Sequence, residues 1–176
     1  FYGTSNGGLT VTGGEAVVQT EFLVELLKRC KEAGIHTSIE TCSACSWDKI
    51  RQTLPYIDEY LCDVKHTDPV KLRAETGGDA QMLLDNIRKL AENGAKILAR
   101  VPMIPGFNTD EAEVESIGRF IASCKIPRVE ILNFHRLGVP KYIKCFAGRA
   151  ADAAGAGPAA GDPAQPRARG KRRLNV

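Results

Sequence analysis

The segment QMLLDNIRKLAENGAKILARV, residues 81–101, decides the fold class because it holds a helix and a strand joined by a glycine. Its first part has apolar residues at helical spacing, which predicts a helix over 81–93 with one buried face. Gly94 then stands where a left-handed helix cap is expected. The short apolar run that follows, 96–101, predicts a buried strand.

The same helix-and-strand unit recurs along the chain. Further strands are predicted over 9–12, 35–40, 59–64 and 128–133. Further helices are predicted over 20–33 and 47–54, from Asp68-Pro69 onward, and from Asn108 to Glu111 onward. Strands that alternate with helices at short spacing predict an α/β fold, with parallel strands in a sheet or a barrel.

Composition indicates an ordinary soluble protein of about one domain, with 176 residues, 43% hydrophobic and 26% charged. No run of 18 apolar residues occurs, so no membrane span is expected. The start, Phe1-Tyr2-Gly3-Thr4, lacks the features of a signal peptide. The six cysteines are scattered, which suits reduced thiols. We therefore expect a cytoplasmic protein.

The chain is predicted to divide into a folded part, 1–146, and a disordered tail, 147–176, rich in Ala, Gly, Pro and Arg. The tail holds six basic residues against two acidic ones, and the rest holds 18 against 19. The run Lys171-Arg172-Arg173 is either a solvated basic tail or a nucleic-acid patch. The near-neutral folded part predicts no nucleic-acid partner.

Polar groups follow the ends of five predicted strands, and this pattern carries the functional prediction. A barrel of parallel strands builds its active site from the loops at its C-terminal rim. The groups are Glu15, the pair Glu40-Thr41, the pair Asp63 and Lys65, Arg100 and His135. Together they indicate an enzyme site for a charged small molecule.

The segment Thr12-Gly13-Gly14-Glu15 allows two interpretations. Its glycines let a backbone approach a ligand closely, and its carboxylate could hold an ammonium group. It could equally be a simple turn between a strand and a helix. The pair Cys42 and Cys45 is half of a metal or redox signature, and the simpler interpretation is two unreactive loop thiols.

The remaining strand-end residues also have alternatives. The oxygens of Glu40, Thr41 and Asp63 could share a hard cation, or could cap helices. Lys65 lies on the same face as Asp63 and could neutralise it, pair with a ligand, or act as a Schiff-base amine in a different α/β enzyme. Arg100 needs a partner, and a ligand is one candidate.

Five motifs, in this order, resemble those of the glycyl-radical-enzyme activating enzymes. These are radical S-adenosylmethionine (SAM) proteins, typified by pyruvate formate-lyase activating enzyme. The resemblance runs from about Phe1 to Tyr142. The motifs are GGLTVTGGE at 7–15, IETC at 39–42, CDVKH at 62–66, RVPMIPGFN at 100–108 and FHRLG at 134–138.

The resemblance implies a partial (β/α) barrel of the radical SAM type, of which this chain would lack the first βα unit. It implies SAM and a 4Fe-4S cluster as cofactors, with a possible monovalent cation. The partners it implies are a glycyl radical enzyme, which loses a glycine Cα hydrogen, and an electron donor such as flavodoxin or ferredoxin. The implied SAM contacts are Gly13, Gly14, Glu15, Lys65, Arg100 and His135, and the implied cation ligands are Glu40, Thr41 and Asp63.

This sequence also departs from the family pattern. The family's cluster-binding C-x-x-x-C-x-x-C loop does not occur, and we expect it upstream of Phe1. The isolated chain is therefore predicted to be inactive, and the alternative is a degenerate SAM-binding or partner-docking remnant. Ala16 replaces the usual proline, which would loosen the turn after Glu15, and Ser43 replaces the usual glycine, which would strain its loop.

Overall fold

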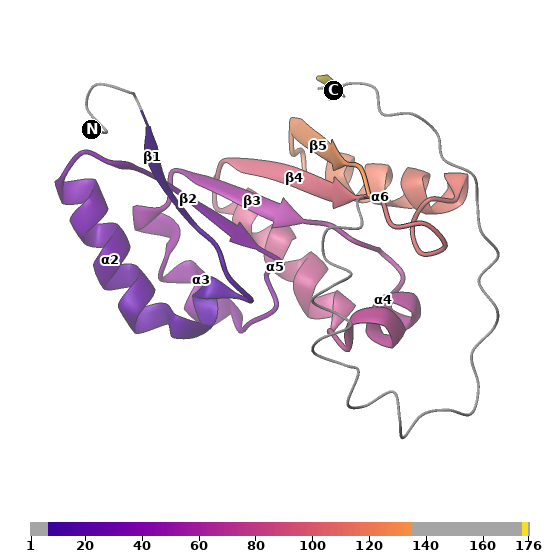
Figure 1. The fold of residues 1–176 in the computed structure, drawn as a ribbon, viewed down its shortest axis with the longest axis horizontal. Helices are drawn as coiled ribbons and strands as arrows, with labels where there is room; N and C mark the ends of the chain where they lie inside the picture. Colours follow the sequence, from indigo (N-terminus) through magenta and orange to yellow (C-terminus); the bar gives the residue numbers. More distant parts are fainter. Residues whose placement is uncertain (1–6, 135–173, 176) are drawn as a thin grey trace. The chain divides into compact units, whose positions relative to one another are not determined.

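The computed structural model describes residues 7–134 and 174–175. Five parallel strands lie side by side in chain order, as Figure 1 shows. They are β1 (Gly8–Val11), β2 (His36–Thr41), β3 (Glu59–Asp63), β4 (Ile97–Pro102) and β5 (Arg128–Leu132). The two-residue strand β6 (Leu174–Asn175) pairs antiparallel with β5. All five predicted strands are confirmed, each within one residue of its expected bounds.

Helices connect the strands and confirm the predicted α/β class. They are η1 (Ala16–Gln19), α2 (Thr20–Glu32), α3 (Trp47–Arg51), η2 (Leu54–Tyr56), α4 (Pro69–Thr76), α5 (Ala80–Glu92) and α6 (Glu111–Ser123). The Asp68 carboxylate caps α4, and the Asp79 carboxylate caps α5. An open sheet of parallel strands connected by helices is a partial (β/α) barrel.

Glycines follow two of the long helices, and the one at Gly94 confirms the predicted cap. Gly34 after α2 has φ 68°, and Gly94 after α5 has φ 75°. Both values lie in the left-handed region that glycine adopts without steric cost. The prediction of one helix over 47–54 is wrong, because α3 ends at Arg51 and the separate turn η2 follows. Pro55 lies in η2, where its ring blocks a continuing α-helix.

The two faces of the sheet differ in burial, because successive strand residues point to opposite faces. Ile39, Cys62 and Ala99 have no exposed surface and belong to the hydrophobic core, together with apolar residues of α2, α5 and α6. Among the residues next to them in sequence, Ser38 is buried, whereas the others, including Glu40 and Asp63, are only partly buried. One face therefore packs against helices, while the other is polar and open.

The strand register sets which polar residues share the open face. Asp63 is directly opposite Arg100 in the β3–β4 pair, and Arg100 is opposite Glu130 in the β4–β5 pair. Glu40 is opposite Leu61, two residues before Asp63. The four polar side chains consequently lie on one side of the sheet, toward the carboxyl ends of their strands.

Two predictions fall mostly outside the described residues: His135, and the tail 147–176 apart from Leu174 and Asn175. The division into a folded part and a tail therefore stays a prediction. The five described cysteines are free thiols, as expected. Among residues 7–134 and 174–175, no helix is long and apolar enough to cross a membrane.

Candidate functional site

The turn after β1 presents an open backbone. Gly13 has φ 156°, a conformation that is essentially limited to glycine. Gly13 and Gly14 are exposed, and a Cβ atom on either would meet nothing within 4 Å. The peptide groups of this turn are therefore accessible to a ligand, as the interpretation of 12–15 as a binding segment requires.

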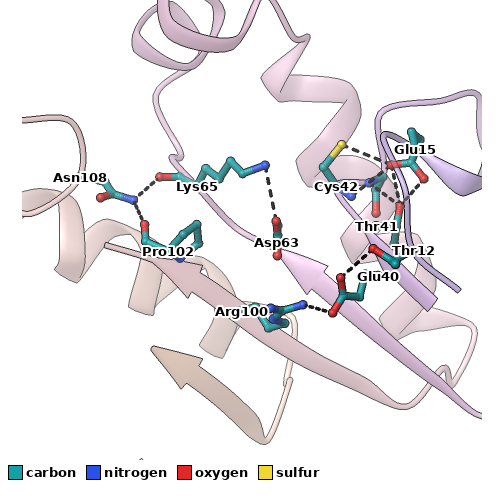
Figure 2. A network of polar contacts seen from close by, with 11 residues as sticks. Thr12, Glu15, Glu40, Thr41, Cys42, Asp63, Lys65, Arg100, Pro102 and Asn108 are labelled. Carbon is teal, nitrogen blue, oxygen red and sulfur yellow. Dashed lines mark hydrogen bonds and ion pairs between the residues drawn. The ribbon is translucent and has the colours of Figure 1, made fainter. Parts of the chain in front are cut away.

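Glu15 connects this turn to the end of β2. Its two carboxylate oxygens each lie 2.8 Å from the Thr41 hydroxyl, which donates to them. The backbone N–H of Cys42 donates to the same carboxylate over 3.1 Å, and the Cys42 thiol over 3.2 Å, as Figure 2 shows. Glu15 also caps η1 through the N–H of Val17. Glu15 thus caps η1 and also binds the end of β2 at the carboxyl-end rim of the sheet.

The thiols beside Glu15 are held in their neutral form. Burial raises the pKa of Cys42, and its hydrogen bond to Glu15 and the negative charge of Glu15 raise it further. Burial and the charge of Glu15 likewise raise the pKa of Cys45 to about 11. Protonated thiols are poor nucleophiles and poor metal ligands. This fits the interpretation of the Cys42 and Cys45 pair as unreactive loop thiols.

Arg100 lies between two glutamates on the open face. Its Nη1 donates to Glu40 Oε1 over 2.7 Å, and Glu40 also accepts from the Thr12 hydroxyl over 2.9 Å (Figure 2). Its Nε is buried, has no hydrogen-bond partner in the described chain, and lies 3.6 Å from Glu130 Oε2. A buried donor without a partner is unfavourable, so Arg100 retains capacity for a further acceptor.

Glu130 was not among the predicted site residues. Its only signal in the sequence was its place in the predicted strand over 128–133, since parallel pairing sets it opposite Arg100. Which residue of one strand faces which residue of another is not encoded locally. The pairing of β4 with β5 in the structure is what assigns Glu130 to the open face.

Asp63 and Lys65 form the ion pair that their spacing suggested. Lys65 Nζ lies 3.5 Å from Asp63 Oδ2, and about a third of each side chain is exposed. Both groups are therefore fixed loosely and are accessible from the open face. In Figure 2 the Lys65 side chain extends toward Asp63.

The residues predicted to hold a cation have different partners. Glu40 and Thr41 are successive strand residues, so their side chains point to opposite faces. Glu40 binds Arg100, whereas the Thr41 hydroxyl binds Glu15. Among the residues that the structure describes, no three His, Cys, Asp or Glu side chains are grouped to hold a metal ion. The described thiols therefore do not fit a 4Fe-4S cluster, which takes several cysteine ligands.

A small cavity of about 120 Å³ opens beside Lys65. Its walls are mainly apolar and come from the loops after β2 and β3 and from α4 and α5. Cys42, Asp63 and His66 also line it, and the apolar contributors are Ala44, Val64, Leu72, Leu83, Leu84 and Ile87. The apolar cavity therefore lies directly beside the polar residues that follow β3.

Asn108 is a second residue whose role the sequence did not reveal, because it was interpreted only as a helix start. It is fully buried, and its Oδ1 accepts from the Ile104 N–H over 2.7 Å. Its Nδ2 donates to the carbonyl oxygens of Lys65 and Pro102, over 2.7 and 2.8 Å (Figure 2). Asn108 therefore joins the loop after β4 to the loop after β3.

Comparison with known proteins identifies relatives of this arrangement. The chain is 41% identical over 144 residues to an isethionate sulfite-lyase activating enzyme from Desulfovibrio desulfuricans, covering 81% of this chain and 46% of that protein. It is 38% identical over 142 residues to a 4-hydroxyphenylacetate decarboxylase activating enzyme from Clostridioides difficile, covering 80% of this chain and 45% of that protein. The chain spans about half the length of the curated relatives it matches.

A solved structure shows the same fold. It is a domain of pyruvate-formate lyase-activating enzyme from Bacteroides vulgatus, which is similar with a TM-score of 0.67 and 27% identity over 82% of this chain and 95% of that one. The SAM-bound form of SuiB from Streptococcus suis has a TM-score of 0.60 at 15% identity, over 82% of this chain and 36% of that one, and shows the fold alone.

The model of the Radical SAM superfamily matches residues 6–116, which is more than half of the chain. Those residues include β1 to β4 and the strand ends that carry Glu15, Asp63, Lys65 and Arg100. Membership of the superfamily implies SAM and a 4Fe-4S cluster as the cofactors. The open polar face is chemically compatible with the first of these, because SAM carries groups of both charges and this face presents carboxylates together with the cationic groups of Lys65 and Arg100. Sequence, fold and site therefore agree that this chain belongs to the radical SAM superfamily.

Proposed function

We propose that this chain is the SAM-binding barrel of an enzyme that activates a glycyl radical enzyme. One observation carries the proposal: Glu15, Asp63, Lys65 and Arg100 lie at the carboxyl ends of neighbouring parallel strands, on the same rim of the sheet. The relatives described above are activating enzymes of an isethionate sulfite-lyase and of a 4-hydroxyphenylacetate decarboxylase, and they support an activating function. Their shared chemistry would be the removal of a hydrogen atom from a glycine Cα of a partner enzyme.

The charges on the open face suit SAM. At neutral pH, SAM carries a positive sulfonium, a positive ammonium and one carboxylate. Glu15 and the exposed backbone of Gly13 and Gly14 would bind the ammonium group. Lys65 would pair with the carboxylate, and Arg100 and His135 would complete the pocket.

Among the described residues at this rim of the sheet, carboxylates outnumber basic groups. The four carboxylates are those of Glu15, Glu40, Asp63 and Glu130, and the two cationic groups are those of Lys65 and Arg100. An excess of negative charge attracts a ligand with net positive charge and raises its local concentration. S-adenosylhomocysteine lacks the sulfonium charge and should therefore bind more weakly.

Of the three residues that the sequence suggested as cation ligands, Thr41 points to the other face and binds Glu15. We therefore propose a monovalent-cation site formed by Glu40 and Asp63, next to the SAM carboxylate, because these two share the open face of adjacent strands. Oxygen ligands of this kind suit a hard cation. SAM titrations in potassium chloride and in tetramethylammonium chloride at equal ionic strength test the site. Equal SAM affinity in both salts would count against it.

In the complete enzyme, SAM and the reduced cluster would together supply a 5′-deoxyadenosyl radical. One electron would come from a donor such as flavodoxin or ferredoxin in the cytoplasm. That electron would break the sulfonium S–C5′ bond and leave methionine, and the radical would take the glycine hydrogen to give 5′-deoxyadenosine. The residues of this chain would bind and orient SAM for that step.

The 176-residue chain should bind SAM without cleaving it. The described thiols do not group to hold a cluster, and the buried Cys45 and Cys62 have raised pKa values that disfavour thiolates. After iron–sulfur reconstitution and addition of dithionite, an assay for 5′-deoxyadenosine should detect no turnover. Sustained product formation by this chain alone would contradict this part of the proposal.

Calorimetry with SAM tests the binding function directly. We expect a dissociation constant in the micromolar range, weakened about tenfold or more by Lys65→Met and by Glu15→Gln. Matched controls are Lys28→Met and Glu32→Gln on exposed positions of α2, which should bind SAM like the unmodified chain. A folded chain that binds no SAM would overturn the proposal and favour a remnant that docks to a partner without binding SAM.

A further inference from the structure

The loop between β3 and α4, residues 64–68, carries Lys65 and is tied to a distant part of the chain. Its Thr67 hydroxyl lies 2.7 Å from the Ser116 hydroxyl on α6, 49 residues away. Lys71, at the start of α4, forms an ion pair with Glu113 of α6. These contacts join the loop that carries a predicted ligand contact to the following βα unit.

The backbone of Lys65 itself is held by Asn108. The carbonyl oxygen of Lys65 accepts from Asn108 Nδ2 over 2.7 Å, in a position where Asn108 is fully buried. The same amide nitrogen donates to Pro102 O, and the amide oxygen accepts from Ile104 N–H. All three bonds are to backbone groups, so Asn108 fixes the path of two loops together.

His66, the next residue, is held from three sides. Its side chain is completely buried, and its Nδ1 accepts from the Asp68 N–H over 2.9 Å. Nδ1 therefore carries no proton, and the ring proton is on Nε2. Nε2 lies 3.0 Å from Glu113 Oε2, a close contact that is poorly aligned for a hydrogen bond. The ring also packs against Phe107, with 4.9 Å between the ring centroids.

We propose that Asn108, His66 and Glu113 are positioning residues that fix the backbone at Lys65 and so set where its ammonium group lies on the open face. The inference rests on the proposed function in so far as Lys65 pairs with the SAM carboxylate. Within residues 7–134, the Lys65 side chain has one ionic contact, the 3.5 Å pair with Asp63. Such a loosely held side chain depends on its backbone for its position, and small displacements of a binding group weaken binding strongly.

Asn108→Asp is the sharpest test because it changes one atom. The variant keeps the oxygen that accepts from Ile104 N–H but replaces the donor to Lys65 and Pro102 by a second acceptor. The matched control is Asn93→Asp at the exposed end of α5, where the amide donates to Lys89 O within its own helix. Glu113→Ala is a second, milder variant, with the exposed Glu115→Ala on the same helix as its control.

The first readout does not depend on SAM. Reductive ¹³C-methylation labels every lysine for NMR. The methyl signal of Lys65 is the one that is missing from the spectrum of Lys65→Arg. The chemical shift of that signal should differ between the unmodified chain and Asp63→Asn, because the Lys65 ammonium group is paired with Asp63. In Asn108→Asp and in Glu113→Ala, it should move toward the position of exposed lysines, while both controls leave it unchanged. Thermal unfolding of each variant establishes that it is folded.

The second readout is SAM affinity by calorimetry. We expect about a tenfold loss in Asn108→Asp and a smaller loss in Glu113→Ala, with the controls unchanged. If the unmodified chain binds no SAM, the proposed function fails, and the Lys65 signal alone decides the positioning role. An unmoved Lys65 signal in folded Glu113→Ala and Asn108→Asp would overturn the inference. If Asn108→Asp does not fold, the signal in Glu113→Ala decides it.

Discussion

Arg100 on β4 binds Glu40 on β2 across the intervening strand β3, with 2.7 Å between Nη1 and Oε1. The contact shows that both side chains lie over the same face of the sheet. It also connects β2 and β4 over β3, at the rim where the SAM contacts are proposed. Because Arg100 is only 19% exposed, this ion pair is screened by water less than an ordinary surface pair.

The Arg100–Glu40 pair should contribute measurably to stability. A double-mutant cycle with Arg100→Met, Glu40→Gln and the double variant should give a coupling free energy of about 1 kcal/mol in urea unfolding. The comparison pair is Arg119 and Glu115 on α6, where both side chains are 65% exposed. Its coupling should be close to zero, and an equal value for the two pairs would show that burial at Arg100 has no effect.

Asp58 should make the chain less stable in acid. Burial alone would raise the pKa of Asp58, but the Lys31 ammonium and the N–H and hydroxyl of Thr37 outweigh it and hold the pKa at about 2. The folded pKa is thus below the ordinary value of 3.8, so the stabilisation is present above about pH 4 and is lost as pH falls toward 2. Asp58→Asn removes this contribution.

Urea unfolding at two pH values checks the Asp58 prediction. At about pH 6 the unmodified chain should be more stable than Asp58→Asn by about 1–2 kcal/mol, and at about pH 2.5 most of that difference should vanish. The exposed Asp48→Asn serves as the control and should differ little from the unmodified chain at either pH. A difference for Asp58→Asn that stays constant between the two pH values would contradict the argument.

The fold was predictable from the sequence because its signals are local. The apolar spacing over 81–93 and Gly94 specify a helix and its end within a few residues, and the structure has α5 and its cap there. The prediction that strand-end residues meet also relied on a general rule of parallel sheets. That rule placed Asp63 and Arg100 together, and the register confirms that they are opposite each other.

Contacts between residues far apart in the sequence were not predictable. Asn108 precedes a helix and follows a proline-rich loop, so its sequence surroundings indicate a helix start. Its actual role is to donate to the carbonyl of Lys65, 43 residues earlier. Glu130 is similarly defined by the strand beside it and by no local pattern. Such residues become visible only when the chain's path brings two loops or strands together.

Two glycines should respond in opposite ways to the same substitution. Gly94 has φ 75°, where an alanine side chain is strained, so Gly94→Ala should lower the free energy of unfolding by about 1 kcal/mol. Gly118 lies within α6, and a Cβ there would meet nothing within 4 Å. Gly118→Ala should therefore raise the free energy of unfolding by about 0.5–1 kcal/mol, because alanine has a higher helix propensity than glycine. Urea unfolding of both variants measures the difference, and a change of the same sign in both would refute the prediction.

Ser43 occupies a strained position beside the proposed site, as its replacement of a glycine suggested. It is fully buried and has φ 59°, in the left-handed region. The loop is kept there by the buried Asn86, whose Nδ2 donates to the carbonyl oxygens of Ser43 and Cys45 over 2.9 and 2.8 Å. The Ser43 N–H also donates to the Thr41 hydroxyl that binds Glu15. Strain at Ser43 is thus maintained by the hydrogen bonds that fix the end of β2.

Ser43→Gly should relieve this strain and raise the free energy of unfolding by about 0.5–1 kcal/mol, since glycine adopts positive φ freely. The control is Ser46→Gly at φ −61°, where the serine makes no capping hydrogen bond and the change should lower stability by only a few tenths of a kcal/mol. Thermal and urea unfolding of the two variants measure the effect. Because Asn86 still holds the loop, SAM affinity should stay the same in Ser43→Gly. A less stable Ser43→Gly would mean that the serine side chain contributes more by packing than its backbone conformation costs.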